Sequence, residues 1–240
     1  MVFVFLHILN DNQKDQSIYN TFINSIYTFY PEAEVIQVSD KHTPAINKVS
    51  NVFRYDGNTK KIMEFRVNAN KELGLTKPAI YLDSDMIITN RFNLKKMLNL
   101  DKTILLRRSF DLNIKFNTKI KNQEFDEYSN YTIDKVFPIL ACLLKTNSYV
   151  FWEEMSKYLY TLEDKFLYWY GDQEILKKLY LENKERFYLI EEKYFACPPQ
   201  FLDKKKFPYL IHFKGLQNKE NLKSQINLIN SYLDVVKKSL

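Results

Sequence analysis

The 240-residue sequence is 45% hydrophobic, 27% charged and 15% aromatic, which is the composition of a globular domain with a sizeable core and excludes wholesale disorder. No apolar run approaches the ~20 residues that a membrane-spanning helix needs. The two cysteines, Cys142 and Cys197, form no CxxC pattern, so neither a disulfide framework nor a cysteine metal site is expected. The N-terminal residues "MVFVFLHILN" read as a first strand and lack the features of a secretory signal, so we expect a cytoplasmic protein.

The formal net charge of +6 favours anionic partners, such as nucleotide phosphates, nucleic acid or an acidic membrane surface. The basic residues are dispersed, and clusters such as Lys204-Lys205-Lys206 stop at three residues. Because the sequence has no zinc-finger spacing, RNP-type aromatic box or long basic helix, nucleic acid is not an expected partner. A lysine-rich solvated surface would explain the same charge. Peripheral membrane contact through the basic surface stays open.

Hydrophobic periodicity predicts strands that alternate with helices along the chain. The expected strands cover residues 2–9, 33–38, 79–82, 103–106, 136–144, 187–190 and 209–213. The expected helices cover residues 16–29, 63–73, 149–162 and 172–183, and a final helix carries an apolar stripe that we expect in the core: Leu222, Ile226, Ile229, Leu233 and Val236. This order indicates a single α/β domain with an open, mostly parallel sheet, which binds ligands at the carboxyl ends of its strands. Residues 107–135 are polar with little periodicity, and a loop of this length is usually functional or disordered.

Two aspartates follow the expected strand at residues 79–82, in the segment "AIYLDSDMIIT". A charge in a dry interior is costly unless it is paired or binds a metal, so Asp83 and Asp85 either end the strand in solvent or hold a cation. A DxD pattern arises by chance roughly once in a chain of this composition, so the pattern alone is no evidence for a metal site. The evidence is its position at the carboxyl end of an apolar strand, where an α/β sheet binds its ligands. The period of an extended chain places both carboxylates on one side, where oxygen ligands suit Mg²⁺ or Mn²⁺.

Two later segments carry further candidate residues. His212 ends an expected strand in "YLIHFKG", where an ordinary hydrogen-bonded core histidine is the alternative to a metal ligand. In "YWYGDQEIL", Gly171 interrupts the chain and Asp172 opens a helix. The alternative role for Asp172 is that of a simple helix N-cap.

These segments, in this order, resemble motifs of the GT-A-fold glycosyltransferases, in particular the retaining glycogenin-like and lipopolysaccharide-galactosyltransferase-like group. That group carries a strand ending in "YLDxD", a "DQ" that opens a later helix, and "HFxG" at a late strand end. The corresponding residues here are 81–85, 172–173 and 212–215. An arginine about seventeen residues before the DxD is also typical, and Arg66 stands 17 residues before Asp83.

The resemblance implies a GT-A-like nucleotide-diphospho-sugar transferase domain over residues 1–240. Residues 1–106 would bind the nucleotide sugar, 107–135 would form a variable loop that acts as a lid or binds the acceptor, and 136–240 would complete the metal and acceptor sites. The donor would be a nucleotide sugar, a UDP-sugar by family habit, and the acceptor a glycan, a lipid-linked sugar or a protein. The implied metal is Mn²⁺ or Mg²⁺, held by Asp83, Asp85 and His212. Donor contacts would come from Arg66, Asp83, Ser84, Gly215 and Lys219, and the catalytic residues would be Asp172 and Gln173.

The sequence departs from the group's pattern at two places. It reads Leu140-Ala141-Cys142 where the group has "NAG", and Asn218 where the group has a lysine, with Lys219 one place later. Two other functions remain open. "LDSDMI" also resembles the haloacid-dehalogenase phosphohydrolases, with Asp83 as nucleophile, although that superfamily has its DxD on the first strand. A non-catalytic nucleotide- or sugar-binding protein of the same fold is the other alternative.

Overall fold

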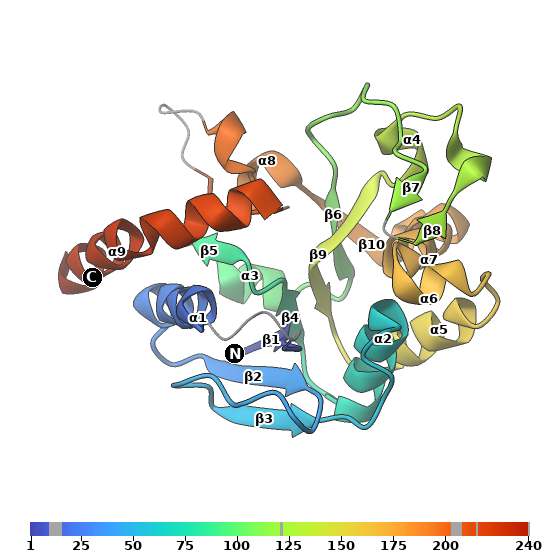
Figure 1. The fold of residues 1–240 in the computed structure, drawn as a ribbon. Helices are drawn as coiled ribbons and strands as arrows, with labels where there is room; N and C mark the ends of the chain where they lie inside the picture. The colour runs from blue at the N-terminus through green and yellow to red at the C-terminus, as the bar shows by residue number, and fades with distance from the viewer. Residues whose placement is uncertain (10–15, 121, 203–207, 215, 240) are drawn as a thin grey trace.

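The computed structural model describes residues 1–9, 16–120, 122–202, 208–214 and 216–239, built around a seven-stranded sheet (Figure 1). The strand order is β10-β6-β9-β4-β1-β2-β3, with β5 and β11 in a second, two-stranded sheet and β7 and β8 in a third. The strands are β1 (Val2–Leu6), β2 (Glu34–Ser39), β3 (Asn51–Arg54), β4 (Ala79–Leu82), β5 (Met86–Ile88), β6 (Thr103–Arg107), β7 (Lys119–Ile120), β8 (Gln123–Glu124), β9 (Ile139–Thr146), β10 (Phe187–Glu191) and β11 (Leu210–His212). The helices are α1 (Ser17–Phe29), α2 (Ile62–Leu73), α3 (Leu94–Leu98), α4 (Ile133–Val136), α5 (Val150–Leu159), α6 (Lys165–Tyr168), α7 (Gly171–Glu182), α8 (Glu192–Phe195) and α9 (Leu216–Ser239), with short 3-10 turns at Asp126–Tyr128, Lys184–Arg186 and Pro199–Phe201.

The main sheet is mostly parallel, as the alternation of strands and helices predicts. β4, β1, β2 and β3 are parallel to their neighbours, as are β6 and β10. Only β9 runs the other way, between β4 and β6. The central strands β1 ("VFVFL") and β4 ("AIYL") are continuous apolar runs because helices cover both faces of the sheet.

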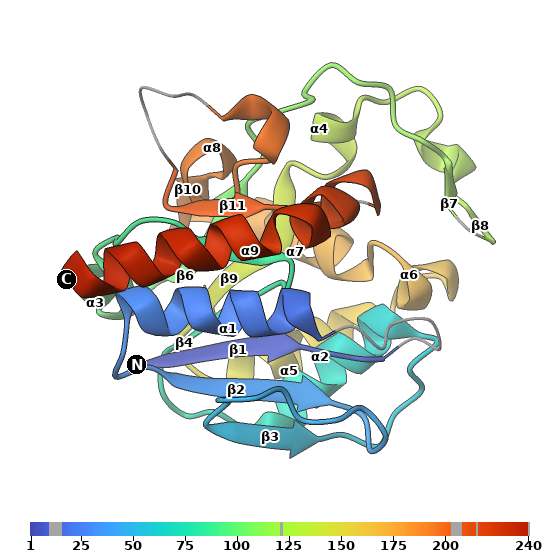
Figure 2. The ribbon, with the colours of Figure 1, turned by 60° about the vertical axis from the view of Figure 1, so that its left-hand side comes forward.

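Each face of the sheet has its own core. α1 and α9 lie side by side over one face, while α2, α5 and α7 cover the other (Figure 2). The expected stripe on the last helix packs in the first core, since Leu222, Ile226 and Leu233 are buried there. Among the described helices, none combines the length and apolar character needed to cross a membrane.

The segment 107–135 has more order than its polarity indicates. It contains the β7–β8 hairpin, a 3-10 turn and α4. Phe116 and Phe125 are buried in a third, largely aromatic cluster with Phe137 and Phe166. These aromatic residues follow no helical or strand period, so the sequence pattern does not reveal that they share a core.

A buried histidine just after β1 gives the fold a pH-dependent stability. His7 is 1% exposed, its ring lies 3.9 Å from that of Tyr19, and its Nδ1 accepts from Gln37 Nε2 at 3.3 Å. Burial lowers the pKa of His7 to about 4; Arg54 lowers it further and Asp40 opposes the change. The folded protein therefore holds His7 neutral, while the unfolded chain protonates it below about pH 6.5.

We expect this difference to cost stability as the pH falls from about 6.5 to 4, because the unfolded state then binds the extra proton. The His7 contribution to that loss is about 2–3 kcal/mol. Urea unfolding at pH 7 and pH 4.5 should show a shallower pH dependence for His7→Asn than for the unmodified protein. His42→Asn is the matched control, because His42 is exposed. Identical pH dependence in the unmodified protein and His7→Asn would contradict the assignment.

Candidate active site

The turn between β4 and β5 carries the DxD pair to the carboxyl end of the sheet. The Asp83 amide donates to Cys142 O of β9 at 2.9 Å, and the Met86 amide closes the turn on Asp83 O at 3.2 Å. β5 then pairs with β11 in antiparallel register, with His212 opposite Met86. This pairing brings the late strand end and the DxD turn together, although they are far apart in the sequence.

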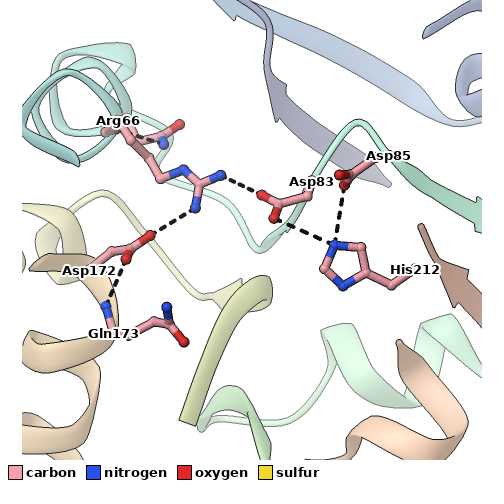
Figure 3. Close-up of polar contacts among 7 residues, drawn as sticks. Arg66, Asp83, Asp85, Asp172, Gln173 and His212 are labelled. Carbon is pink, nitrogen blue, oxygen red and sulfur yellow. Dashed lines mark hydrogen bonds and ion pairs between the residues drawn. The ribbon is translucent and has the colours of Figure 1, made fainter. Parts of the chain in front are cut away.

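Asp83, Asp85 and His212 form a compact cluster (Figure 3). His212 Nε2 lies 3.2 Å from Asp85 Oδ1 and 4.0 Å from Asp83 Oδ2. One ligand atom from each residue lies within 4.8 Å of the others. His212 and Asp85 keep only 6% and 13% of their side-chain surface exposed. The sequence-predicted metal ligands are therefore brought to one point by the fold.

The chemistry of this cluster fits a divalent cation. Two carboxylates and one imidazole supply hard oxygen donors and a nitrogen donor, a set that suits Mn²⁺ or Mg²⁺ better than a softer ion that prefers thiolates. The pKa of His212 lies well above its usual value: burial alone would lower it, but interactions with Cys142 and Asp85 outweigh burial. Since imidazole binds a metal only in its neutral form, metal binding at this cluster acts against the raised pKa of His212.

Arg66 of α2 connects this cluster to the start of α7. Its Nη2 pairs with Asp83 Oδ1, and its Nη1 donates to Asp172 Oδ2 at 2.8 Å (Figure 3). Burial would lower the pKa of Arg66, but the two carboxylates raise it above its usual value. Because Arg66 holds Oδ1 of Asp83, the other oxygen faces His212. Arg66 therefore orients a candidate metal ligand.

Asp172 is buried and is not the N-cap of its helix, so the N-cap alternative is wrong. α7 begins at Gly171, and the N-cap is Tyr170, which adopts a left-handed conformation with φ of 62°. Asp172 is 3% exposed and accepts from the Gln173 amide at 2.8 Å as well as from Arg66. Burial raises the pKa of Asp172, and Arg66 opposes the rise. Asp172 is therefore a buried carboxylate that is paired with Arg66.

Gln173 faces the same region with an unused acceptor. Its side-chain Oε1 is buried and accepts no hydrogen bond from any residue that the structure describes. Buried polar atoms without a partner are rare in native proteins and call for a specific explanation. A hydroxyl donor from a bound molecule would satisfy this oxygen.

The close packing of Gly171 fixes where Asp172 lies. A Cβ at this position would overlap the carbonyl oxygen of Phe166 and lie 2.9 Å from Leu159 Cδ1. We expect Gly171→Ala to cost about 1–3 kcal/mol in the free energy of unfolding, because the backbone must move to admit the methyl group. The same movement should displace Asp172 together with Arg66, which orients Asp83, and so weaken the metal-dependent nucleotide binding that the resemblance implies.

Denaturant unfolding together with calorimetry would test this pair of effects. Gly74→Ala is the control: Gly74 ends α2 with φ of 65°, so alanine costs about 1 kcal/mol there without crowding the site. Equal nucleotide affinity in both variants would show that Gly171 matters for stability alone.

The other expected donor contacts lie around the DxD turn and at the start of α9. Ser84 is half-buried in the turn, between the two aspartates. Gly215 lies outside the described residues. Lys219 belongs to α9, and its side chain also lies outside the described part of the chain.

Sequence reasoning missed Cys142. This residue stands on β9 where the resembling group has glycine, and it is 6% exposed. Its thiol interacts with the His212 imidazole. No spacing rule reveals this contact, because it depends on the antiparallel insertion of β9 beside β4.

Comparison with known proteins identifies the class of fold. Neither a known family model nor any curated protein matches the sequence. Solved structures do match, and several of them are glycosyltransferases. The chain therefore has the GT-A fold, as the motifs predict.

Three of these solved structures illustrate the structural similarity to this chain. The galactosyltransferase LgtC, solved with donor and acceptor sugar analogues, is 15% identical with a TM-score of 0.58, over 100% of this chain and 96% of that chain. The glycosyltransferase GlyE of Streptococcus pneumoniae TIGR4 is 13% identical with a TM-score of 0.55, and the match covers 99% of this chain but only 62% of that chain. A glycosyltransferase involved in glycosylation of the major capsid of PBCV-1 is 8% identical with a TM-score of 0.55, over 92% and 98% of the two chains. At these identities the likeness establishes the fold.

Proposed function

We propose that the protein is a metal-dependent glycosyltransferase that moves a hexose from a nucleotide-diphosphate sugar, a UDP-sugar, to a glycan, lipid-linked or protein acceptor. The observation that carries the proposal is the Asp83–Asp85–His212 cluster at the carboxyl end of β4 in a GT-A fold. This is the edge at which an open α/β sheet binds its ligands. LgtC, a structural neighbour, was solved with donor and acceptor sugar analogues.

Each site residue has a role in this proposal. Asp83, Asp85 and His212 would hold Mn²⁺ or Mg²⁺, and the bound ion would supply Lewis-acid stabilisation of the leaving diphosphate. Arg66 keeps Asp83 oriented and adds fixed positive charge near the leaving group. Ser84, Gly215 and Lys219 would contact the donor.

Asp172 and Gln173 would line the donor sugar. The unused Oε1 of Gln173 suits a sugar hydroxyl, and the Asp172 carboxylate supplies negative charge beside it. The Asp172 carboxylate accepts from Arg66 and from the Gln173 amide, each at 2.8 Å, and a carboxylate fixed in this way is suited to stabilise positive charge on a sugar. We therefore propose a retaining reaction. Residues 1–106 would bind the donor, and residues 136–240 would complete the metal and acceptor sites.

A donor screen by mass spectrometry in the presence of Mn²⁺ would test the function. We expect release of a nucleoside diphosphate from one nucleotide sugar, and loss of that release when EDTA removes the metal. Release of inorganic phosphate from phosphate monoesters, without nucleotide-sugar turnover, would instead indicate a phosphohydrolase with Asp83 as nucleophile. Tight donor binding without turnover, with or without acceptors, would indicate a binding protein.

A further inference from the structure

Arg108, directly after β6, is a buried arginine with unused donors. It is 6% exposed, its Nε donates to Phe137 O at 3.0 Å, and its backbone amide donates to Pro138 O at 2.9 Å. Within the described part of the chain, its two terminal nitrogens make no hydrogen bond and no ion pair within 4.0 Å. These nitrogens are not fully enclosed, so an external anion can reach them, and such an anion would stabilise a charge that is otherwise largely buried.

The two glutamates near Arg108 are engaged by other groups, and the nearby Asp111 is exposed and makes no ion pair with Arg108 among the described residues. Glu192 Oε2 accepts from the amides of Ser109 and Phe110, at 2.8 Å and 3.1 Å. Glu191 pairs with Arg107, the exposed neighbour of Arg108. Burial accordingly lowers the pKa of Arg108, and the more distant attraction of Glu192 does not make up the difference. The guanidinium keeps its capacity for an external carboxylate or phosphate.

Arg108 lies on the face of the sheet that carries His212. Leu106 and Leu140 are paired across β6 and β9 and are buried in the same core as Cys142. Arg108 comes two residues after Leu106, and in an extended chain every second residue lies on the same face of the sheet. Arg108 also interacts electrostatically with Cys142 and with Tyr170, the residue that precedes α7. It therefore borders the candidate site between the metal cluster and the start of α7.

The position of Arg108 along β9 separates it from the metal ligands. Arg108 is opposite Pro138, whereas the Asp83 amide bonds to Cys142. At about 3.4 Å per residue, these two points on β9 are ~10 Å or more apart. The Arg108 backbone is thus displaced along the sheet from the metal ligands, toward the side where a second substrate would approach, and the nucleotide competition described below decides between the two substrates.

The loop that carries Arg108 is held in place. The amides of Ser109 and Phe110 bond to Glu192, and the Phe110 ring stacks on Phe201 with centroids 4.4 Å apart and planes at 2°. A guanidinium fixed in this way binds a planar or tetrahedral oxyanion with little ordering cost.

We propose that Arg108 binds a phosphate or carboxylate group of the acceptor, so that the acceptor is an acidic molecule such as a sugar phosphate or a uronic-acid glycan. This proposal rests on the glycosyltransferase function proposed above. The donor's diphosphate is the other source of a phosphate group, and the experiment separates the two.

Inorganic phosphate is a direct probe that requires no turnover. Titrated at constant ionic strength into protein treated with EDTA, phosphate should raise the Tm of the unmodified protein. Arg108→Gln should weaken phosphate binding by about tenfold or more, as expected for the loss of a charge-assisted hydrogen bond. Arg107→Gln, which removes a neighbouring exposed charge, should bind phosphate normally. Equal loss in both variants, or no stabilisation of the unmodified protein, would overturn the proposal.

A second experiment determines whether the anion bound by Arg108 belongs to the acceptor or to the donor. Phosphate should still bind when a nucleoside diphosphate and Mn²⁺ saturate the donor site, and Arg108→Gln should leave donor-site affinity unchanged in calorimetry. Displacement of phosphate by the nucleotide would place Arg108 in the donor site and overturn the acceptor assignment. Failure of the unmodified protein to bind the nucleotide at all would instead overturn the proposed function, since phosphate binding in EDTA does not depend on it.

Transfer assays complete the test with acceptors matched except for charge: a neutral sugar, its 6-phosphate and the corresponding uronic acid. We expect kcat/KM to favour a charged member by about tenfold in the unmodified protein, and this preference to vanish in Arg108→Gln. Arg108→Lys keeps the charge and the fold if Arg108→Gln does not fold, and should retain part of the preference. Equal use of neutral and charged acceptors by the unmodified protein would contradict the proposal.

Discussion

Replacing Asp85 by alanine should abolish the Mn²⁺-dependent binding of a nucleoside diphosphate. Asp85 supplies one of three ligand atoms that lie within 4.8 Å of one another, so its loss leaves an incomplete donor set. Changes to residues that only support metal ligands cost about 10–100-fold in affinity, so loss of a direct ligand should cost at least about 100-fold. Calorimetry with and without Mn²⁺ measures this effect.

Thermal unfolding gives a second readout of the Asp85→Ala variant. Mn²⁺ should raise the Tm of the unmodified protein, because an ion that binds only the folded state stabilises it, and should not raise that of Asp85→Ala. Asp56→Ala is a suitable control, since Asp56 is exposed and pairs with Lys41 at the surface. Unchanged nucleotide affinity in Asp85→Ala would show that this cluster does not bind the metal.

Changing Asp172 to asparagine should lower turnover by about 100-fold or more. The variant loses a buried negative charge beside the proposed donor sugar, and one preorganised electrostatic contact supplies ~3 kcal/mol of transition-state stabilisation. Donor affinity should fall much less, because this contact matters most in the transition state. Measurement of kcat together with the Kd of the nucleotide separates these two effects.

The same variant should also lose stability, because Asp172 is a partner of Arg66 and not a replaceable cap. An asparagine can still accept from the Gln173 amide but leaves the Arg66 guanidinium with Asp83 alone. We expect a loss of about 1–3 kcal/mol. Asp164→Asn is the matched control, since its ion pair with Lys61 is largely exposed and worth little. A folded Asp172→Asn protein with normal turnover would limit Asp172 to orienting Arg66.

Apolar patterning predicted most of the framework of this fold. Apolar runs identified β1, β4, β6 and β9, alternation identified β2, and helical stripes identified α1, α2, α5, α7 and α9 within a few residues. The C-terminal residue of α2 was also predictable, because Gly74 adopts the left-handed conformation that glycine tolerates best. β3 and β5 were not predicted, because β3 is a half-exposed edge strand and β5 is only three residues long.

The motif residues of the site were predictable, but their mutual contacts were not. The sequence places Asp83, Asp85 and His212 at strand ends, and the fold brings their ligand atoms together through the pairing of β5 with β11. The bridge from Arg66 to both Asp83 and Asp172 depends on α2 and α7 packing on the same face. Such contacts follow from tertiary packing, which local periodicity does not encode. The buried Arg108 is a further case, since its sequence neighbours suggest only a basic strand end.

The placement of β9 has a consequence for how the chain folds. β9 is the central partner of both β4 and β6 but follows them in sequence, and it begins roughly 60 residues after β4 ends. Contacts of such high sequence separation must pay loop-closure entropy before they gain stability, so this topology favours slow folding. Until β9 is in place, β4 and β6 each present an unpaired apolar edge, the kind of surface that invites intermolecular association. During synthesis, the chain is therefore most prone to aggregate in the interval between the appearance of β4 and the completion of β9.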